Sequence, residues 1–229
     1  ACLDLNTLFR LHWGGKVHGE TFDRLVREEF RPRLERMQRE AVERGYLTPR
    51  VVYGYYPCQS SGNDLIIYDP TDPERALARL TFPRQPGHDR LCLADYFASV
   101  TSGRRDVVAF QVVTVGETAD DLADALHQAG EYTESYFVHG LATQCAEALA
   151  EWTHRRIRRE LGIAPEQGKR YSWGYPACPD LEDHVKVWKI LPVAETIGVT
   201  LTASYQLVPE QSTAAMVVHH PEAIYYSVR

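Results

Sequence analysis

An arginine followed by a stiff aromatic loop is the part of this sequence whose residues could do chemistry. Residues 170–179 read Arg-Tyr-Ser-Trp-Gly-Tyr-Pro-Ala-Cys-Pro. The planar guanidinium of Arg170 suits a bidentate carboxylate, and the aromatic rings offer faces for a heterocycle or a cation. Gly174 lets backbone approach a ligand closely, and the two prolines stiffen the loop. From this chemistry alone, an ordinary surface loop with an exposed arginine is the competing interpretation.

Length, composition and charge limit the class of protein to which this chain can belong. The chain has 229 residues, 44% hydrophobic and 24% charged, which is typical of a globular protein and predicts one domain, with room for two lobes. The net charge of −6 disfavours nonspecific binding to nucleic acid. No apolar run approaches the roughly 18 to 20 residues that span a bilayer, and the N-terminal residues Ala-Cys-Leu-Asp-Leu-Asn show no basic region before an apolar core. Five cysteines without a CxxC pair indicate reduced thiols and a cytoplasmic protein.

Two common kinds of site are disfavoured. Neither a GxGxxG nor a GxxxxGK[ST] motif is present, so the usual dinucleotide and phosphate loops lose support. His219 and His220 suggest a metal, but adjacent residues of a strand point to opposite faces and no third ligand is spaced nearby. We therefore expect no metal site.

Alternating hairpins and helices must position the loop. Apolar spacing predicts a helix over 20–46 with a break or kink at Pro32, and strands over 51–57 and 64–68 joined through 59–63. Further expected elements are a strand at 76–81, a short helix at 92–99, a buried strand at 106–115, two helices within 117–160 separated near Gly130, a helix at 180–196 stopping near Gly198, and strands at 213–219 and 224–228. The pattern favours an α+β fold around a mainly antiparallel sheet.

The segment 170–179 resembles the Arg-x-x-x-Gly-Tyr-Pro-Ala-Cys-Pro segment of the activation domain of cobalamin-dependent methionine synthase. Residues 4–9 are similar to the family's Asp-Trp-x-Pro-Phe-Phe, although the tryptophan and the proline are missing. Other similar segments are 53–57 with 64–68, 91–96, 146–151, 220–221 and 225–226. The resemblance implies that residues 1–229 form a single C-shaped domain, with a mainly antiparallel twisted sheet flanked by helices, and are a C-terminal fragment of a larger multidomain enzyme.

In that family the segment forms much of an S-adenosylmethionine site. The residues that carry over as ligand groups are Asp4, Glu147, Arg170, Tyr175, Tyr225 and Tyr226, with backbone contributions from Tyr171, Ser172, Trp173 and Gly174. Two carboxylates would oppose the ammonium and sulfonium, and the arginine would pair with the ligand's carboxylate. Each residue also has a structural alternative: Asp4 as a helix N-cap, Glu147 as a solvated helix residue, and Tyr225 with Tyr226 as a strand pair with one ring buried.

The resemblance implies a function shared with other domains. The domain would present the methyl group of S-adenosylmethionine to cobalamin on a neighbouring cobalamin-binding domain, while a flavodoxin-type protein supplies an electron, so that oxidised cobalamin is reactivated for methionine biosynthesis. Positioning would be its contribution, so we expect no catalytic triad, and the isolated domain should not make methionine. The alternative is a noncatalytic S-adenosylmethionine-binding or interaction module, which could be a separate subunit.

A basic run lies in this otherwise acidic chain. Residues 154–159 read His-Arg-Arg-Ile-Arg-Arg, and Arg155, Arg158 and Arg159 share a helical face. One interpretation is a patch that docks the acidic flavodoxin or the cobalamin domain. The other is a solvated helix end whose arginines favour the negative end of the helix dipole.

Overall fold

The computed structural model describes residues 2–87 and 90–228, and the chain divides into two compact units. Unit 1 consists of residues 1–50, 113–151 and 208–212; unit 2 consists of residues 51–112, 152–207 and 213–229. No helix of the described residues is long and apolar enough to cross a membrane. Each unit has its own hydrophobic core, so each is described by itself.

Unit 1 is built from helices. Its first helical segments are α1 (Leu5–Thr7), the π-helical turn η1 (Leu8–His12), α2 (Glu20–Leu25), the π-helical turn η2 (Val26–Phe30) and α3 (Arg31–Arg44), followed by α4 (Thr118–Gln128) and part of α5 (Tyr132–Glu160). The predicted helix over 20–46 is present. Its hydrogen bonding changes at the π-helical turn η2, directly before Pro32, whose missing N–H cannot continue the α-helical ladder.

Aromatic rings form the centre of unit 1. Phe9, Trp13, Phe30 and Phe137 are all buried, and Trp13 meets Phe137 edge-on with ring centroids 5.0 Å apart. The indole Nε1 of Trp13 also donates to the carbonyl of Phe137 at 3.1 Å. The predicted separation of two helices near Gly130 is confirmed, because α4 ends at Gln128 and α5 begins at Tyr132. Helix α5 therefore packs against the N-terminal segment through its aromatic residues.

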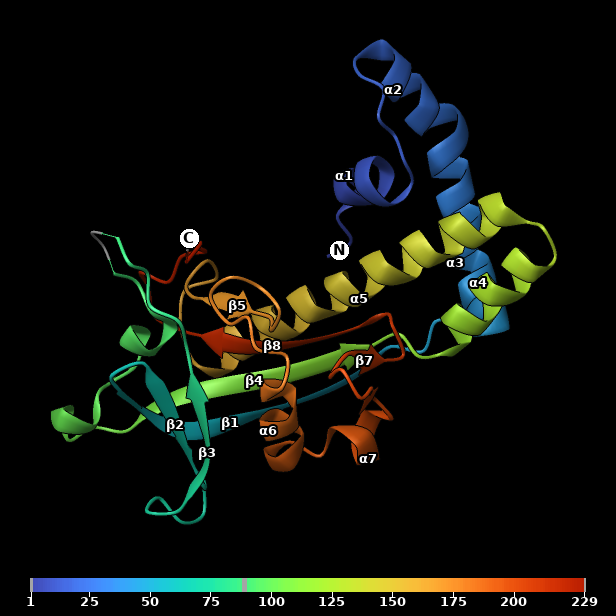
Figure 1. Ribbon diagram of the computed structural model, residues 1–229. Helices are drawn as coiled ribbons and strands as arrows, with labels where there is room; N and C mark the ends of the chain where they lie inside the picture. Colours follow the sequence, from blue (N-terminus) through green and yellow to red (C-terminus); the bar gives the residue numbers. More distant parts are fainter. Residues whose placement is uncertain (1, 88–89, 229) are drawn as a thin grey trace. The chain divides into compact units, whose positions relative to one another are not determined.

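Unit 2 is organised by a six-stranded sheet of order β3-β2-β1-β4-β8-β5 (Figure 1). The strands are β1 (Arg50–Ser61), β2 (Asp64–Tyr68), β3 (Ala76–Thr81), β4 (Asp106–Thr114), β5 (Lys169–Tyr171) and β8 (Ser212–Val218), and β6 (Thr200–Leu201) pairs separately with β7 (Leu207–Val208). The β1–β2, β2–β3 and β5–β8 pairings are antiparallel. The expected α+β fold with a mainly antiparallel sheet is thus confirmed.

Both faces of the sheet are covered by helices. On one face, Ile157 near the end of α5 packs on Ala109 of β4 and Val217 of β8. The main core of unit 2 contains apolar residues of the strands together with buried residues of α6 (Asp183–Ile190) and α7 (Val193–Ile197), and with Leu93, Ala94 and Tyr96 of the short 3-10 helix η3 (Leu93–Tyr96). A second 3-10 helix, η4, covers Val100–Ser102.

Three predicted elements differ from the structure. The expected loop 59–63 is mostly strand: β1 continues to Ser61, and the chain turns only at Gly62 and Asn63. The helix expected over 180–196 is two helices, since Pro192 cannot donate the bond that would continue α6. Residues 224–228 form no strand, because side chains, and not a neighbouring strand, bond their backbone.

Candidate functional site

The strand β5 places Arg170 in the middle of a short antiparallel pairing. Lys169, Arg170 and Tyr171 lie opposite Val218, Val217 and Met216 of β8. A tight corner comes first: Gly168 has a φ of +76°, and a Cβ there would lie 2.4 Å from the carbonyl oxygen of Val218. Glycine is therefore required where the chain enters β5, and this corner sets the position of Arg170 two residues later.

A cluster of positive charge surrounds Arg170. His154 is buried, and burial together with three nearby cations lowers its pKa from 6.5 to about 3. The cations, in order of effect, are Arg158, Arg170 and Lys169. His154 therefore stays neutral at physiological pH, and the positive charges of Arg158, Arg170 and Lys169 suit an anionic partner such as a carboxylate.

Histidine titration tests this electrostatic arrangement. Folding keeps His154 neutral, so its contribution to stability falls as pH drops below 6.5 towards about 3. His219 behaves oppositely: its hydrogen bond to Asp106, at 2.7 Å, raises its pKa, so its contribution is full below about 6.5 and is lost as pH rises through the folded pKa. In NMR spectra between about pH 5 and about pH 8, the His154 ring should not titrate, and His219 should show a midpoint above the usual histidine value. A His154 midpoint within this range would contradict the buried cluster; His154→Gln and His219→Gln assign the signals.

The loop after β5 is held by its own backbone. Gly174, at φ +88°, donates to the carbonyl of Cys178 at 3.0 Å, and Cys178 donates back to the carbonyl of Tyr175 at 3.0 Å. The thiol of Cys178 also bonds the carbonyl of Ser172 at 2.9 Å. Ala177 and Cys178 are buried while Tyr175 and Pro176 are exposed, so the loop presents a rigid tip.

Only one aromatic ring of this loop faces solvent. Tyr175 is 66% exposed, whereas Tyr171 and Trp173 are 4% and 5% exposed. Trp173 stacks on Phe110 and meets His184 edge-on at 5.1 Å between ring centroids. The rings of Tyr171 and Trp173 thus belong to the core, and Tyr175 is the ring that can cover a ligand.

The structure brings the C-terminal tyrosines to the same region of unit 2. The ring of Tyr225 lies 5.5 Å from that of Tyr171, and the Tyr171 hydroxyl donates to the carbonyl of Ile224 at 2.6 Å. Tyr225 is exposed and Tyr226 is half-buried. Among the described residues, the buried hydroxyl of Tyr226 has no hydrogen-bond partner. A buried hydroxyl without a partner is costly, so a ligand that paired with it would gain affinity.

A hollow of about 560 Å³ lies between this loop and the end of the chain. Its described lining consists of Pro83, Gly174, Tyr175, Pro176, Pro179, Ser227 and Val228. Figure 1 shows the orange loop after β5 beside the red C-terminal segment. Of the predicted residues, Gly174 and Tyr175 lie in this lining, while Arg170, Tyr225 and Tyr226 lie outside it.

The two predicted carboxylates belong to unit 1. Asp4 caps α1, since its Oδ1 accepts from the amides of Asn6 and Thr7 at 3.0 and 3.1 Å, and these bonds with the Thr7 hydroxyl lower its pKa. Glu147 is exposed on α5. Burial lowers the pKa of His12, and the negative charge of Glu147 opposes this effect without reversing it. Gly140 permits this arrangement, because a Cβ there would lie 3.0 Å from the His12 carbonyl oxygen.

The expected basic patch is wrong in one residue. Arg158 is only 8% exposed and donates to the carbonyls of Gln167 and Gly168 at 2.8 and 3.2 Å. Arg155 and Arg159 are exposed, as expected. The corner before β5 covers Arg158, although this residue lies only three residues from the exposed Arg155. Helical spacing alone does not reveal this burial.

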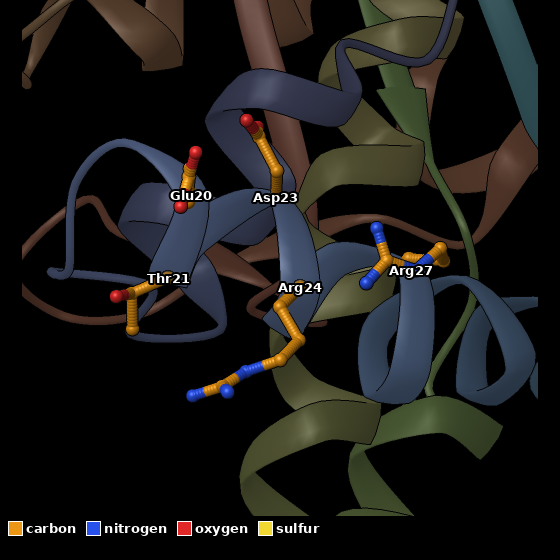
Figure 2. A pocket seen from close by; sticks show the side chains of 5 residues that line it. All are labelled: Glu20, Thr21, Asp23, Arg24 and Arg27. Atoms are coloured by element: carbon orange, nitrogen blue, oxygen red, sulfur yellow. The ribbon is translucent and has the colours of Figure 1, made fainter.

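Other polar features carry no assigned ligand. A hollow of about 440 Å³ in unit 1 is lined by Glu20, Thr21, Asp23, Arg24 and Arg27. Figure 2 shows Glu20 and Asp23 pointing away from Arg24, so the hollow presents both signs of charge without converging groups. Among the described residues, no group of three side chains could hold a metal ion.

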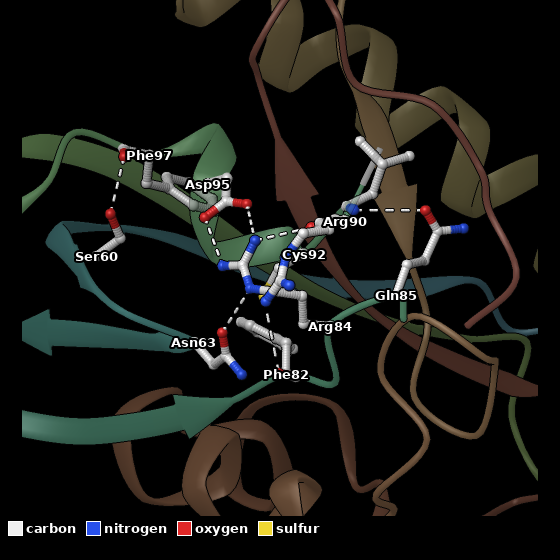
Figure 3. Close-up of polar contacts among 10 residues, drawn as sticks. Ser60, Asn63, Phe82, Arg84, Gln85, Arg90, Cys92, Asp95 and Phe97 are labelled. Carbon is white, nitrogen blue, oxygen red and sulfur yellow. Dashed lines mark hydrogen bonds and ion pairs between the residues drawn. The ribbon is translucent and has the colours of Figure 1, made fainter. Parts of the chain in front are cut away.

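Sequence reasoning missed several residues around the hollow. Arg84 forms two hydrogen bonds with the Asp95 carboxylate, and it also donates to Asn63 Oδ1 at 2.9 Å and to the Arg90 carbonyl at 2.8 Å (Figure 3). Gln85 follows directly and bonds the C-terminal segment. No motif marks these residues, because their partners are scattered over separate segments at residue 63, residues 90–95 and residue 227.

Known proteins are similar to this chain over nearly its whole length. The family model described as "Vitamin B12 dependent methionine synthase, activation domain" matches residues 28–229. A methionine synthase of Mycobacterium tuberculosis is 41% identical over 255 residues, covering 99% of this chain, and one of Mycobacterium leprae is 38% identical over the same length and share. This chain spans 21% of the length of each of these relatives.

A solved structure is also similar. The crystal structure of the MetH reactivation domain bound to AdoHcy matches with a TM-score of 0.84 and 29% identity. The match covers 97% of this chain and 75% of that chain. The similarity therefore extends over the described parts of both units.

Proposed function

This chain belongs to the family of vitamin B12 dependent methionine synthase activation domains, and we propose that it binds S-adenosylmethionine and presents the ligand's methyl group to cobalamin on another domain. The observation that carries the proposal lies within unit 2. A cationic cluster around Arg170 stands at the base of a rigid loop, and Gly174 and Tyr175 of that loop line a hollow of about 560 Å³. The similar reactivation domain, whose structure contains AdoHcy, supports this choice of ligand.

The chemistry of the ligand fits the residues present. S-adenosylmethionine carries a carboxylate, which suits the guanidinium of Arg170 within its positive surroundings. Its adenosyl part is aromatic and polar, so it suits the exposed ring of Tyr175 and the unpaired buried hydroxyl of Tyr226. Tyr225 and the peptide groups of residues 171–174 complete the proposed unit 2 contacts. Asp4 and Glu147 are proposed as the carboxylates for the ligand's cationic groups on the strength of the sequence resemblance.

Positioning is the role that these residues can perform. S-adenosylmethionine carries its methyl group on a positively charged sulfur; on transfer to cobalamin, the sulfur would keep the bonding electrons and S-adenosylhomocysteine would remain. No proton is transferred in that step, so no general base is needed. Arg170 would hold one end of the ligand and the stiff loop the other, so that the methyl group has a fixed direction. Orientation of this kind can supply several kcal/mol of rate enhancement, up to about 7 to 11 in favourable cases.

Calorimetry with S-adenosylmethionine tests the proposal. The chain should bind with one site, and Arg170→Ala should weaken binding roughly 10- to 100-fold, because a charge-assisted hydrogen bond is lost. Arg156→Ala is the matched control: this arginine is exposed and bonds Glu160 at 2.8 Å, so its loss should leave the affinity unchanged. Absence of binding by the unmodified chain, or equal affinity in Arg170→Ala, would rule out the assignment.

The same titration with S-adenosylhomocysteine examines the proposed carboxylates. That product lacks the sulfonium charge, so a carboxylate that opposes the sulfonium should matter less for it. Asp4→Asn or Glu147→Gln should then reduce the affinity for S-adenosylmethionine more than the affinity for S-adenosylhomocysteine. Electron delivery by a flavodoxin-type donor is proposed for the whole enzyme, where reactivation of oxidised cobalamin can be followed.

A further inference from the structure

The chain from residue 219 to residue 228, here called the C-terminal strap, carries Tyr225 and Tyr226 without being part of the sheet. It follows β8 directly and forms neither helix nor strand. Ala223 is buried in the core of unit 2, while Ile224 and Tyr225 are exposed. The strap also contributes Ser227 and Val228 to the lining of the 560 Å³ hollow. Something other than a strand ladder must hold this wall in position.

Two tyrosines hold the peptide of Ile224 from both sides. The Tyr171 hydroxyl donates to the Ile224 carbonyl at 2.6 Å, and the Ile224 amide donates to the Tyr96 hydroxyl at 3.4 Å. Tyr96 comes from η3 and Tyr171 from β5, and both rings are buried. These two hydrogen bonds therefore connect the strap, just before Tyr225 and Tyr226, to two parts of the core.

Gln85 fixes the strap near its end. Its side-chain Nε2 donates to the carbonyl of Ser227, and its Oε1 accepts from the amide of Leu91 at 3.4 Å. The backbone amide of Gln85 donates to the Leu91 carbonyl at 3.0 Å, so both the backbone and the side chain of the glutamine bond Leu91. Figure 3 shows Arg84 turned towards Asp95.

The residue before Gln85 is anchored independently. Arg84 is held by four hydrogen bonds, to the carboxylate of Asp95, the amide oxygen of Asn63 and the carbonyl of Arg90. Pro83, on the other side of Arg84, lines the hollow together with residues of the 174–179 loop. The segment 83–85 is thus held in place by these bonds, and the hydrogen bond from Gln85 to the Ser227 carbonyl fixes the strap to this segment.

We propose that Gln85, Tyr96 and Tyr171 are positioning residues that hold the C-terminal strap against the 174–179 loop and so set the shape of the ligand site. This inference rests on the proposed binding of S-adenosylmethionine. Side-chain to backbone bonds at His219, Ile224 and Ser227 hold the strap where a strand would have a ladder. Loss of one bond leaves the strap free to sample other positions, and the ligand must then order it again on binding, which lowers affinity.

Isosteric variants separate positioning from general stability. Gln85→Met keeps the length of the side chain and removes its amide; Tyr171→Phe removes only the hydroxyl that bonds Ile224. Hydrogen exchange of residues 219–228 in the ligand-free chain should become about tenfold faster in either variant, while exchange in β4 stays unchanged. Calorimetry well below the thermal midpoint should show S-adenosylmethionine affinity reduced about five- to tenfold.

Tyr53→Phe is the matched control. Its hydroxyl donates to Glu160 at 3.0 Å, so this variant also loses a tyrosine hydroxyl bond in unit 2 but should change neither strap exchange nor affinity. Unchanged strap exchange in both Gln85→Met and Tyr171→Phe would overturn the inference, as would faster exchange with unaltered affinity. If the unmodified chain does not bind S-adenosylmethionine, the proposed function fails, and the exchange result still decides whether these side chains hold the strap.

Discussion

Replacement of Gly168 by alanine should lower the free energy of unfolding by about 2 to 4 kcal/mol, because two penalties coincide at this position. The φ of +76° is unfavourable for any residue with a Cβ. The added Cβ would also lie 2.4 Å from the Val218 carbonyl oxygen and 3.0 Å from the Cα of His219, both backbone atoms that cannot rotate away. The pairing of β5 with β8 must therefore shift, and Arg170 with it.

Chemical denaturation and thermal unfolding measure this effect, with Gly162→Ala as the control. Gly162 also has a positive φ, +67°, but a Cβ there meets no heavy atom within 4 Å. In the control, the free energy of unfolding should therefore fall by only about 1 kcal/mol, the cost of a positive φ for alanine. The Gly168→Ala thermal midpoint should fall by roughly 5 to 10 °C. Equal losses in the two variants would mean that Gly168 does not approach the backbone of β8 closely.

Arg158→Met should cost about 2 to 4 kcal/mol of unfolding free energy, although the sequence marks this residue as one of a basic surface run. The side chain is buried and its guanidinium serves the carbonyls of Gln167 and Gly168. Methionine fills similar space but donates no hydrogen bond, so two carbonyls at the corner before β5 lose a charged donor. The corner that places Arg170 would loosen.

Arg159→Met is the comparison within the same helix. Arg159 is exposed, so this substitution should change stability by less than about 0.5 kcal/mol in denaturation experiments. A second measurement is the pKa of His154, which should rise in Arg158→Met because Arg158 is the strongest of the cations that lower it. If Arg158→Met and Arg159→Met are equally stable and His154 is unchanged, Arg158 is an ordinary surface arginine.

Local signals predicted most of the elements. The strand over 76–81 and the helix stop at Gly198 are confirmed, because alternation of apolar residues and a glycine with φ +76° are local properties. The missed break between α6 and α7 also had a local cause, since Pro192 has no N–H to continue the helical ladder of α6. The extent of β1 depended on its partner: residues 58–61 are polar enough to suggest a loop, yet they pair with β2 and are mostly buried.

The candidate site was only partly accessible to sequence reasoning. The loop at 170–179 carries its own signature in glycine, proline and aromatic residues, whose conformational limits act over a few positions. Gln85, Tyr96 and Arg158 have no such signature, because each acts through a carbonyl or amide of a segment remote in sequence. A side chain's type says what it can donate but not which backbone atom it will meet.

The sequence by itself therefore determined the rigid loop with its arginine, the α+β class and the family resemblance, since these follow from residue types and their local spacing. Only the tertiary structure decided that Trp173 and Arg158 are buried, that Tyr175 alone of its loop exposes a ring, and that a strap without a strand ladder forms one wall of the hollow. Burial and long-range hydrogen bonds depend on which surfaces meet when the chain folds, and that information is spread over the whole chain rather than held in any one motif.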